Sequence, residues 1–506
     1  MTATPLTPAP QRLSFGTKAL YGFGSITFGV TTLSLTSGVL QPYLNRVIGL
    51  PALWVGTAIM ATLLLDAFID PLIGQFSDKL RTPWGRRHPL MYLSAPLVAL
   101  FCVVFWNSPT SWPPEKSGVF LIGMLMLLRL SVSLYEVPSA ALAPELTLDY
   151  HQRTILFGYR FFFLVVGGLG MNVVLYQVFL SPAAGGILNR AGYAHYGILA
   201  AVVMATSILI SALGTHRRIP HLVRPVARQV PLGQVLREMA LTLSNPSLIV
   251  VMVSGVCSGI SGGLTSALSQ YFYIELWGLN AKSISMLAIA GVFASLSGVA
   301  LAAPAARIFG KKTAMMLLFP IYVVADALPQ SLRLLGLMPP NGSPWVLGIL
   351  AGDVFFAGTL AIAGFIIISS MIADVVEDAA VKTGVRSEGL LFAANGLLPK
   401  VTTGVGVFMA GLLITLVKFP THAAAGAVSP EIMRHMSLLY LPFSTGMKAL
   451  SVLVLIFYRI DKKTHEQNLA TLAQVAGHAD FEAAPLSGPA AGAAAGIGLD
   501  ATAPRV

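Results

Sequence analysis

Charge is scarce in this sequence. Only 10% of its 506 residues are Asp, Glu, Lys or Arg, whereas 55% are hydrophobic. The mean hydropathy is +0.75. A soluble globular protein of this length carries about a quarter charged residues, so the composition excludes the soluble classes. It indicates a chain that lies largely within a lipid bilayer.

Cysteine and enzyme motifs are also scarce. Cys102 and Cys257 are far apart and fall inside apolar runs, so we interpret them as packing residues rather than as a disulfide or metal site. The sequence has no HExxH and no Walker motif, and its nine histidines lie mostly between the apolar runs. It therefore predicts neither an enzyme nor a bound cofactor.

Apolar runs of about 20 residues dominate what is present, and each is long enough to cross a membrane as a helix. They do not alternate as the strands of a membrane barrel would, so we expect an all-α integral membrane protein. The twelve expected helices are 17–43, 52–76, 89–108, 117–145, 156–181, 195–213, 246–275, 283–305, 313–332, 345–373, 388–417 and 436–458.

A basic, Pro-containing segment divides these helices into two sets of six. Two related halves that move about a central site are typical of secondary transporters. The tail is polar and then rich in Ala, Gly and Pro, which predicts disorder. The expected organisation is a cytoplasmic N-terminus (1–16, without a signal-peptide pattern), an N-terminal half (17–213), a central cytoplasmic loop (214–245), a C-terminal half (246–458) and a cytoplasmic tail (459–506).

The net charge of +11 follows membrane topology rather than nucleic-acid binding. With the N-terminus inside, the inner segments contain 20 Lys and Arg residues and the outer loops contain 7. Such a bias predicts that both termini are cytoplasmic, in what we expect to be the bacterial inner (plasma) membrane.

Two carboxylates, Asp66 and Asp70, lie one helical turn apart inside the second apolar run. Both side chains share one helix face, roughly 6 Å apart along the axis. Intramembrane acids are costly and usually functional. Because two such anions repel each other, they need a shared cation or a shared proton, unless a basic partner makes them purely structural.

Other polar groups fall inside the expected helices. Ser133 and Glu136 share a face of the fourth helix, and Arg129 lies on the same face. Arg160 and Lys400 belong to the fifth and eleventh helices. These groups form either a functional mixed-charge set or a static salt-bridge network; the same alternative applies to Asp353 and Lys448.

A further set of charges is expected at the cytoplasmic ends of the helices. Ion pairs between the halves would hold an outward-facing state and break on switching, although simple solvation of the loops is the alternative. The residues of this expected cytoplasmic gate are Asp78, Arg81, Arg86, Arg87, Asp374, Glu377, Arg386 and Glu388.

The second helix and the loop after it carry a specific motif. It comprises Asp66, Asp70-Pro71, Gly74, Asp78, Arg81, Trp84-Gly85-Arg86-Arg87 and Pro89. It resembles the signature of the glycoside–pentoside–hexuronide:cation symporters, the melibiose permease branch of the major facilitator superfamily. Supporting similarity runs from Tyr21-Gly22-Phe23-Gly24 through Glu136-Val137-Pro138 to Lys400.

The resemblance implies a major facilitator fold and roles for individual residues. It implies that Asp66 and Asp70 bind the coupling H⁺ or Na⁺, as metal ligands if the ion is Na⁺, with help from Ser133. By the same resemblance Glu136, Arg160 and Asn395 contact the substrate. Lys400 is expected to belong to the same substrate-binding set, to link it to the ion site and to mimic a cation when the ion site is empty.

Three positions depart from the family pattern. Gly29 replaces an acid of the sugar binders, Ala140 replaces an aromatic residue, and Ile69 replaces a polar residue of many Na⁺-using members. The first two changes make galactosides a poor expectation, and the third favours H⁺.

We therefore expect a monomeric, cation-coupled symporter of a sugar or glycoside that works by alternating access, with lipid as its surroundings and no nucleic-acid partner. A carrier of a lysophospholipid or other amphiphile, whose phosphate would suit Arg160, is one alternative. A proton-driven exporter is the other.

Overall fold

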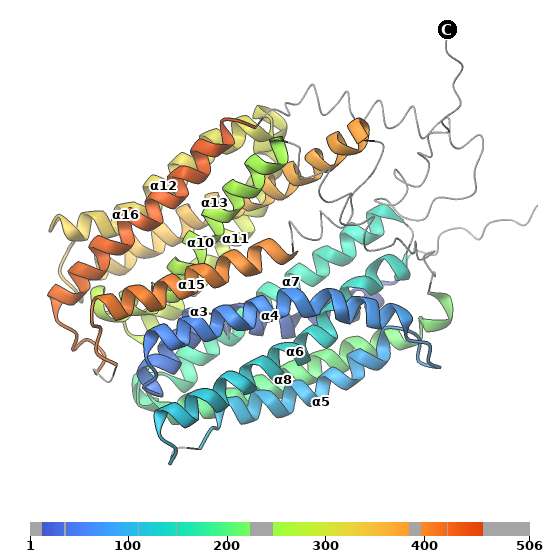
Figure 1. The fold of residues 1–506 in the computed structure, drawn as a ribbon, viewed down its shortest axis with the longest axis horizontal. Helices are drawn as coiled ribbons and strands as arrows, with labels where there is room; N and C mark the ends of the chain where they lie inside the picture. The colour runs from blue at the N-terminus through green and yellow to red at the C-terminus, as the bar shows by residue number, and fades with distance from the viewer. Residues whose placement is uncertain are drawn as a thin grey trace, which may run out of the picture.

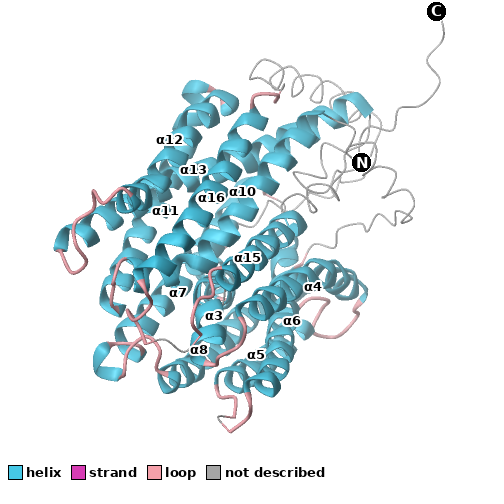
Figure 2. Cartoon of the chain, turned by 60° about the vertical axis from the view of Figure 1, so that its left-hand side comes forward, coloured by secondary structure: helices cyan, strands magenta, loops and turns pink. Residues whose placement is uncertain are grey.

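The computed structural model describes residues 13–34, 37–109, 111–147, 149–222, 246–383, 396–421 and 424–458. Within these ranges the chain is helical and has no strand (Figure 2). Eleven of the described helices are long and apolar enough to cross a membrane. They correspond to the second to the twelfth expected helix, and this part of the fold prediction is confirmed.

The N-terminal half forms one side of the bundle in Figure 1. Its long helices pack against one another in the pairs α4–α6, α5–α6 and α5–α8, and α1 and α2 pack on α7. The elements are α1 (Phe15–Phe23), α2 (Ser25–Gly29), η1 (Val30–Ser34), α3 (Ser37–Pro42), η2 (Tyr43–Val47), α4 (Ala52–Lys79), α5 (His88–Trp106), α6 (Pro114–Leu146), α7 (Tyr150–Val174), η3 (Leu175–Phe179), η4 (Pro182–Ala184), α8 (Arg190–His216) and η5 (Ile219–His221).

The C-terminal half forms the other side. The pairs α11–α13, α10–α16 and α12–α13 hold it together. Its elements are α10 (Pro246–Tyr271), η6 (Phe272–Leu276), α11 (Ala281–Phe309), α12 (Lys311–Leu334), α13 (Pro344–Thr383), α15 (Leu398–Leu416) and α16 (Pro430–Leu455).

The first expected helix, 17–43, consists of several short elements. It runs from α1 to η2 and changes to π-helical geometry at Val30–Ser34 and Tyr43–Val47. Gly29 lies at the end of α2 against α7, where a Cβ would be 2.0 Å from the carbonyl oxygen of Leu164. Glycine is therefore required at residue 29 by close helix packing, because no side chain fits there.

Hydropathy placed the start of the last helix six residues too late. The expected start was 436, but α16 begins at Pro430. The Ser429 side chain accepts a hydrogen bond from the Ile432 N–H, Pro430 occupies the first turn and Glu431 complements the helix dipole. A search for apolar runs does not detect a first turn that is polar and contains these capping residues.

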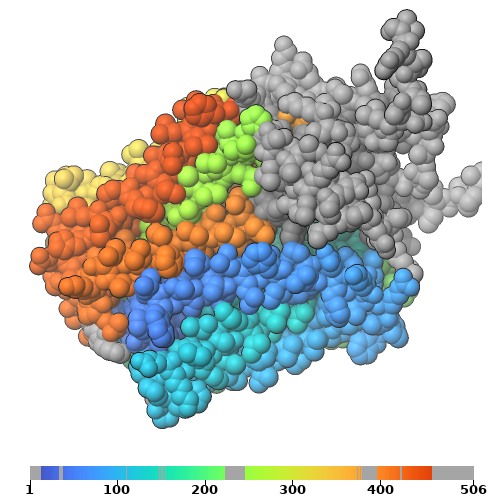
Figure 3. Space-filling view, viewed as in Figure 1, coloured from blue at the N-terminus to red at the C-terminus, as the bar shows by residue number. Residues whose placement is uncertain are grey.

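The two halves meet most closely along α4 and α15, which lie side by side in Figure 3. Small residues allow this approach: a Cβ on Gly56 would be 2.9 Å from the Val407 carbonyl oxygen, and a Cβ on Gly411 would be 2.5 Å from that of Ala52. Backbones that approach this closely are typical of helix contacts in membranes.

The end of the bundle at which α4 begins carries the loops 48–51, 277–280 and 417–429, and we call it the far end. The terminal end is the opposite end, where the described chain begins at Leu13 and finishes at Tyr458.

Candidate functional site

Asp66 and Asp70 lie on α4, and each pairs with a different base. The Nε and Nη2 atoms of Arg129 both lie 2.6 Å from Oδ2 of Asp66. Arg129 belongs to α6 of the same half, and both side chains are largely buried, at 13% and 7% exposure. Arg129 was recognised in the sequence as an intramembrane charge but not as the partner of Asp66.

Asp70 pairs across the boundary between the halves. The Lys400 ammonium on α15 donates a hydrogen bond to its Oδ2 atom. The other carboxylate oxygen of Asp70 is buried and has no hydrogen-bond partner among the residues that the structure describes. A single ion pair thus joins the two halves at the carboxylate expected to bind the coupling ion.

Glu136 and Arg160 form the third pair, between α6 and α7 of the N-terminal half. Arg160 also donates hydrogen bonds to the Ser139 hydroxyl at 2.8 Å and to the Tyr21 hydroxyl at 3.3 Å. Tyr21 in turn donates to the Ser139 carbonyl oxygen at 2.9 Å. These contacts fix the plane of the guanidinium and leave it little freedom to turn.

These pairs belong to one site. Glu136 interacts electrostatically with Asp70 and Lys400 as well as with Arg160. The structure thus brings together the sequence-predicted residues of four helices. We call the following six side chains the charge cluster: Asp66, Asp70, Arg129, Glu136, Arg160 and Lys400. Its three acids and three bases carry no net charge.

Two further predicted site residues have different outcomes. Ser133 is buried on α6, one turn after Arg129. Asn395 lies outside the described residues, so its expected contact with the substrate stays a prediction.

The expected gate at the terminal end contains ion pairs within each half. Arg87 binds Asp78 at 2.5 Å and Glu145 at 2.9 Å, and Arg86 binds Glu145 at 3.0 Å. In the other half Lys311 binds Asp374 at 2.5 Å.

The remaining gate residues leave the expectation of ion pairs between the halves untested. Arg81 is exposed, and Arg386, Glu388 and the side chain of Glu377 lie outside the described part. Ion pairing between the halves at this end therefore stays a prediction.

An ion pair between the two halves does occur at the far end. Arg46 and Glu275 lie 2.7 Å apart, and both side chains have 0% exposure. Glu275 also accepts hydrogen bonds from the Gly426 and Val428 N–H groups, and Arg46 donates to the Ala424 carbonyl oxygen. In the sequence Arg46 is only one of the seven basic residues of the outer loops, because nothing in its neighbourhood marks a partner 229 positions away.

Hydrogen bonds between uncharged side chains accompany this pair. The Tyr271 hydroxyl donates to Asn45 at 2.9 Å, and Gln270 donates to the Tyr176 hydroxyl. Gln177 donates to the Ser285 hydroxyl at 2.9 Å. All of these bonds cross between the halves.

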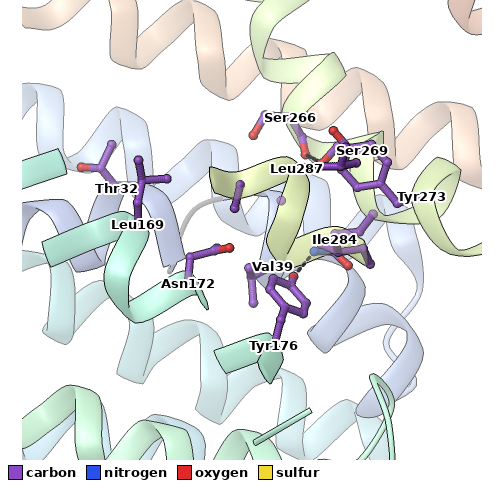
Figure 4. A pocket seen from close by; sticks show the side chains of 13 residues that line it. Thr32, Val39, Leu169, Asn172, Tyr176, Ser266, Ser269, Tyr273, Ile284 and Leu287 are labelled. Atoms are coloured by element: carbon purple, nitrogen blue, oxygen red, sulfur yellow. Dashed lines mark hydrogen bonds between the residues drawn. The ribbon is translucent and has the colours of Figure 1, made fainter. Parts of the chain in front are cut away.

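A cavity of about 340 Å³ lies between the halves beside these bonds (Figure 4). Residues from α7 and from α10 face each other across it, and the side chains that line it are amides, hydroxyls and apolar groups without a formal charge. The polar ones are Thr32, Asn172, Tyr176, Ser266, Ser269, Gln270 and Tyr273. Such a lining suits a neutral, hydrogen-bonding ligand.

A second set of intramembrane charges lies within the C-terminal half. Lys448 on α16 binds Asp326 on α12 at 2.5 Å and lies 5.3 Å from the centre of the Tyr322 ring. Asp353 on α13 interacts electrostatically with both Asp326 and Lys448. Asp326 was missed in the sequence, and its contact with Lys448 joins two helices of the same half.

A family-level comparison agrees with this architecture. The family described as MFS/sugar transport protein matches residues 20–462. The chain belongs to this family.

Individual members of the family align over most of the chain. An uncharacterized symporter of Synechocystis sp. is 26% identical over 80% of this chain and 86% of its own length. The isoprimeverose transporter of Lactiplantibacillus pentosus is 23% identical, covering 85% and 86%. The relatives are transporters, which confirms the expectation that the chain is not an enzyme.

A solved structure extends the comparison to the fold. The xylose transporter XylE from E. coli, in an inward open conformation, has a TM-score of 0.58 at 15% identity and covers 90% of this chain and 99% of its own. The major facilitator fold expected from the sequence is therefore confirmed. The protein is an integral membrane secondary transporter.

Proposed function

We propose that this protein is a cation-coupled symporter of a neutral sugar or glycoside that works by alternating access. The observation that carries the proposal is the ion pair between Asp70 of one half and Lys400 of the other. Because Lys400 supplies the positive charge at Asp70, an incoming cation must take its place, and ion binding thereby changes a contact between the halves. A link of this kind is what coupling requires.

The neutral cavity supports the substrate class. Seven hydroxyl- or amide-bearing side chains line it, and none carries a formal charge. The similarity to an isoprimeverose transporter points to the same class. Glu136 and Arg160 are proposed to bind substrate hydroxyl groups next to the ion site, since a charged group strengthens hydrogen bonds to a neutral partner.

Alternating access is supported by where the halves touch. The described polar contacts between them extend from Arg46–Glu275 at the far end to Asp70–Lys400. With both termini cytoplasmic, as the excess of basic residues indicates, the far end is extracellular. We therefore assign this arrangement to the state closed to the outside, in the plasma membrane.

Thermal stability of the purified protein against a ligand panel tests the substrate class. The panel contains glycosides, pentosides, hexuronides and lysophospholipids, because bound ligand raises the melting temperature by mass action. Stabilisation by a sugar, lost in Arg160→Ala but kept in the control Lys282→Gln, supports the proposal. Stabilisation by lysophospholipid alone overturns it in favour of an amphiphile carrier.

Proteoliposomes test the coupling. Accumulation of that sugar against its gradient under an inward cation gradient is expected. Accumulation driven by an outward gradient would instead identify an exporter that exchanges protons.

A further inference from the structure

The Asp66 carboxylate is already held by a cation that belongs to the protein. Two nitrogens of Arg129 lie 2.6 Å from the same oxygen, and the pair is largely buried between α4 and α6. This geometry is that of a strong, charge-assisted contact. The Arg129 guanidinium occupies the side of Asp66 that faces α6, the helix that also carries Ser133.

Arginine differs from lysine in this position, because a guanidinium stays protonated in proteins. A metal ion approaching Asp66 would have to displace Arg129 and leave a buried charge without a partner, which is strongly unfavourable. Asp70 is likewise held by Lys400.

The oxygen atoms of the two carboxylates lead to the same result. Na⁺ requires several free oxygen ligands, whereas Oδ2 of Asp66 and Oδ2 of Asp70 are both taken, so each carboxylate keeps at most one free oxygen. The residues present therefore do not fit a sodium site at the pair of aspartates.

We propose that Arg129 takes the place of an alkali cation at Asp66, so that this protein binds neither Na⁺ nor Li⁺ at the Asp66–Asp70 pair. Arg129 is thus an ion-selectivity residue. This inference rests on the proposed function only in using the same aspartates, and for that symport it leaves the proton as the coupling ion.

Direct ion binding tests the proposal without any sugar. Melting temperature and calorimetric titration are measured in NaCl or LiCl against choline chloride at constant ionic strength. The wild-type protein is expected to show no saturable response. Arg129→Gln is expected to gain a saturable rise in melting temperature with Na⁺ or Li⁺, because it frees the Asp66 carboxylate.

Two matched variants complete the experiment. Lys116→Gln removes one positive charge from an exposed position of the same helix and should gain nothing. Asp66→Asn combined with Arg129→Gln should lose the gained response. Its loss shows that the new ion binds at Asp66.

Two outcomes overturn the inference. One is a saturable Na⁺ response of the wild-type protein that Asp66→Asn removes, a measurement that decides the matter even if Arg129→Gln does not fold. The other is a folded Arg129→Gln variant without any response. Failure to transport a sugar would count against the proposed function alone, because the ion-binding result does not depend on it.

Discussion

Arg46 and Glu275 form a fully buried ion pair, 2.7 Å apart, that joins the two halves of the molecule at the far end. Glu275 is also bound by two backbone N–H groups of the loop 417–429. Any movement that separates the halves at this end must break the pair and expose both charges to water. Water is where the cost of separating two ions is smallest, so the pair is suited to a contact that opens and closes.

Arg46→Ala is expected to destabilise the closed far end by about 3–5 kcal/mol, because it leaves Glu275 buried without its partner. The variant should populate the state open at that end. A cysteine introduced at Ser269, in the cavity, should then react faster with a membrane-impermeant thiol reagent, with Cys102 and Cys257 replaced by Ala.

Arg190→Ala is the matched control for this experiment. Arg190 also lies at the far end, but it binds Ser108 and Pro109 of its own half. Equal labelling rates in the Arg46 and Arg190 variants would contradict the assigned role of Arg46.

Asp70→Asn is expected to abolish accumulation driven by the cation gradient. The asparagine cannot hold a cation in place of Lys400, whereas exchange of substrate across the membrane needs no gradient and should persist. Both rates are measured in proteoliposomes. Glu115→Gln, which removes one carboxylate from an exposed position of α6, should keep both activities. Normal accumulation by the Asp70 variant would remove this residue from the coupling step.

Arg160→Ala is expected to weaken substrate binding by at least about tenfold, since hydrogen bonds to charged groups contribute roughly 1.5–3 kcal/mol. The readout is the concentration of the stabilising sugar that gives half of the maximal rise in melting temperature. Arg153→Ala serves as control, because Arg153 lies on the same helix and donates to the Thr147 carbonyl oxygen. Unchanged affinity in the Arg160 variant would exclude it from the binding site.

Asn172→Ala and Ser266→Ala test the neutral cavity from both halves. Each should weaken sugar binding by about five- to tenfold, because a typical hydrogen bond contributes about 1 kcal/mol. Gln330→Ala removes a buried amide that bonds to Ser437 away from the cavity, so it should leave affinity unchanged. If all three variants bind equally, the sugar binds elsewhere.

The helices were predictable because each needs only a local property, a run of apolar residues long enough for the bilayer. The irregular first segment was not, because its breaks depend on contacts such as that of Gly29 with α7. The polar first turn of α16 was missed for a different reason, since its capping residues lower the local hydropathy.

The candidate site shows a similar division. Helical spacing indicated that Asp66 and Asp70 share a face and that Arg129 lies on the face of Glu136. Spacing within one helix cannot tell which acid a base on another helix will reach, so the Asp66–Arg129 pair required the packing of α4 on α6. Arg46–Glu275 was beyond prediction because both residues come from segments next to loops and belong to different halves of the chain.

The neutrality of the charge cluster has an electrical consequence. A membrane potential does work of about 2.3 kcal/mol per unit charge for each 100 mV crossed. In the proposed symport cycle, the matched acids and bases of the cluster would add no net charge to the unloaded carrier during its return. One bound cation would give the loaded carrier one positive charge at the same place. Voltage should therefore speed the loaded movement and leave the return nearly unaffected, so that an inside-negative cell drives accumulation even when the ion concentrations on the two sides are equal.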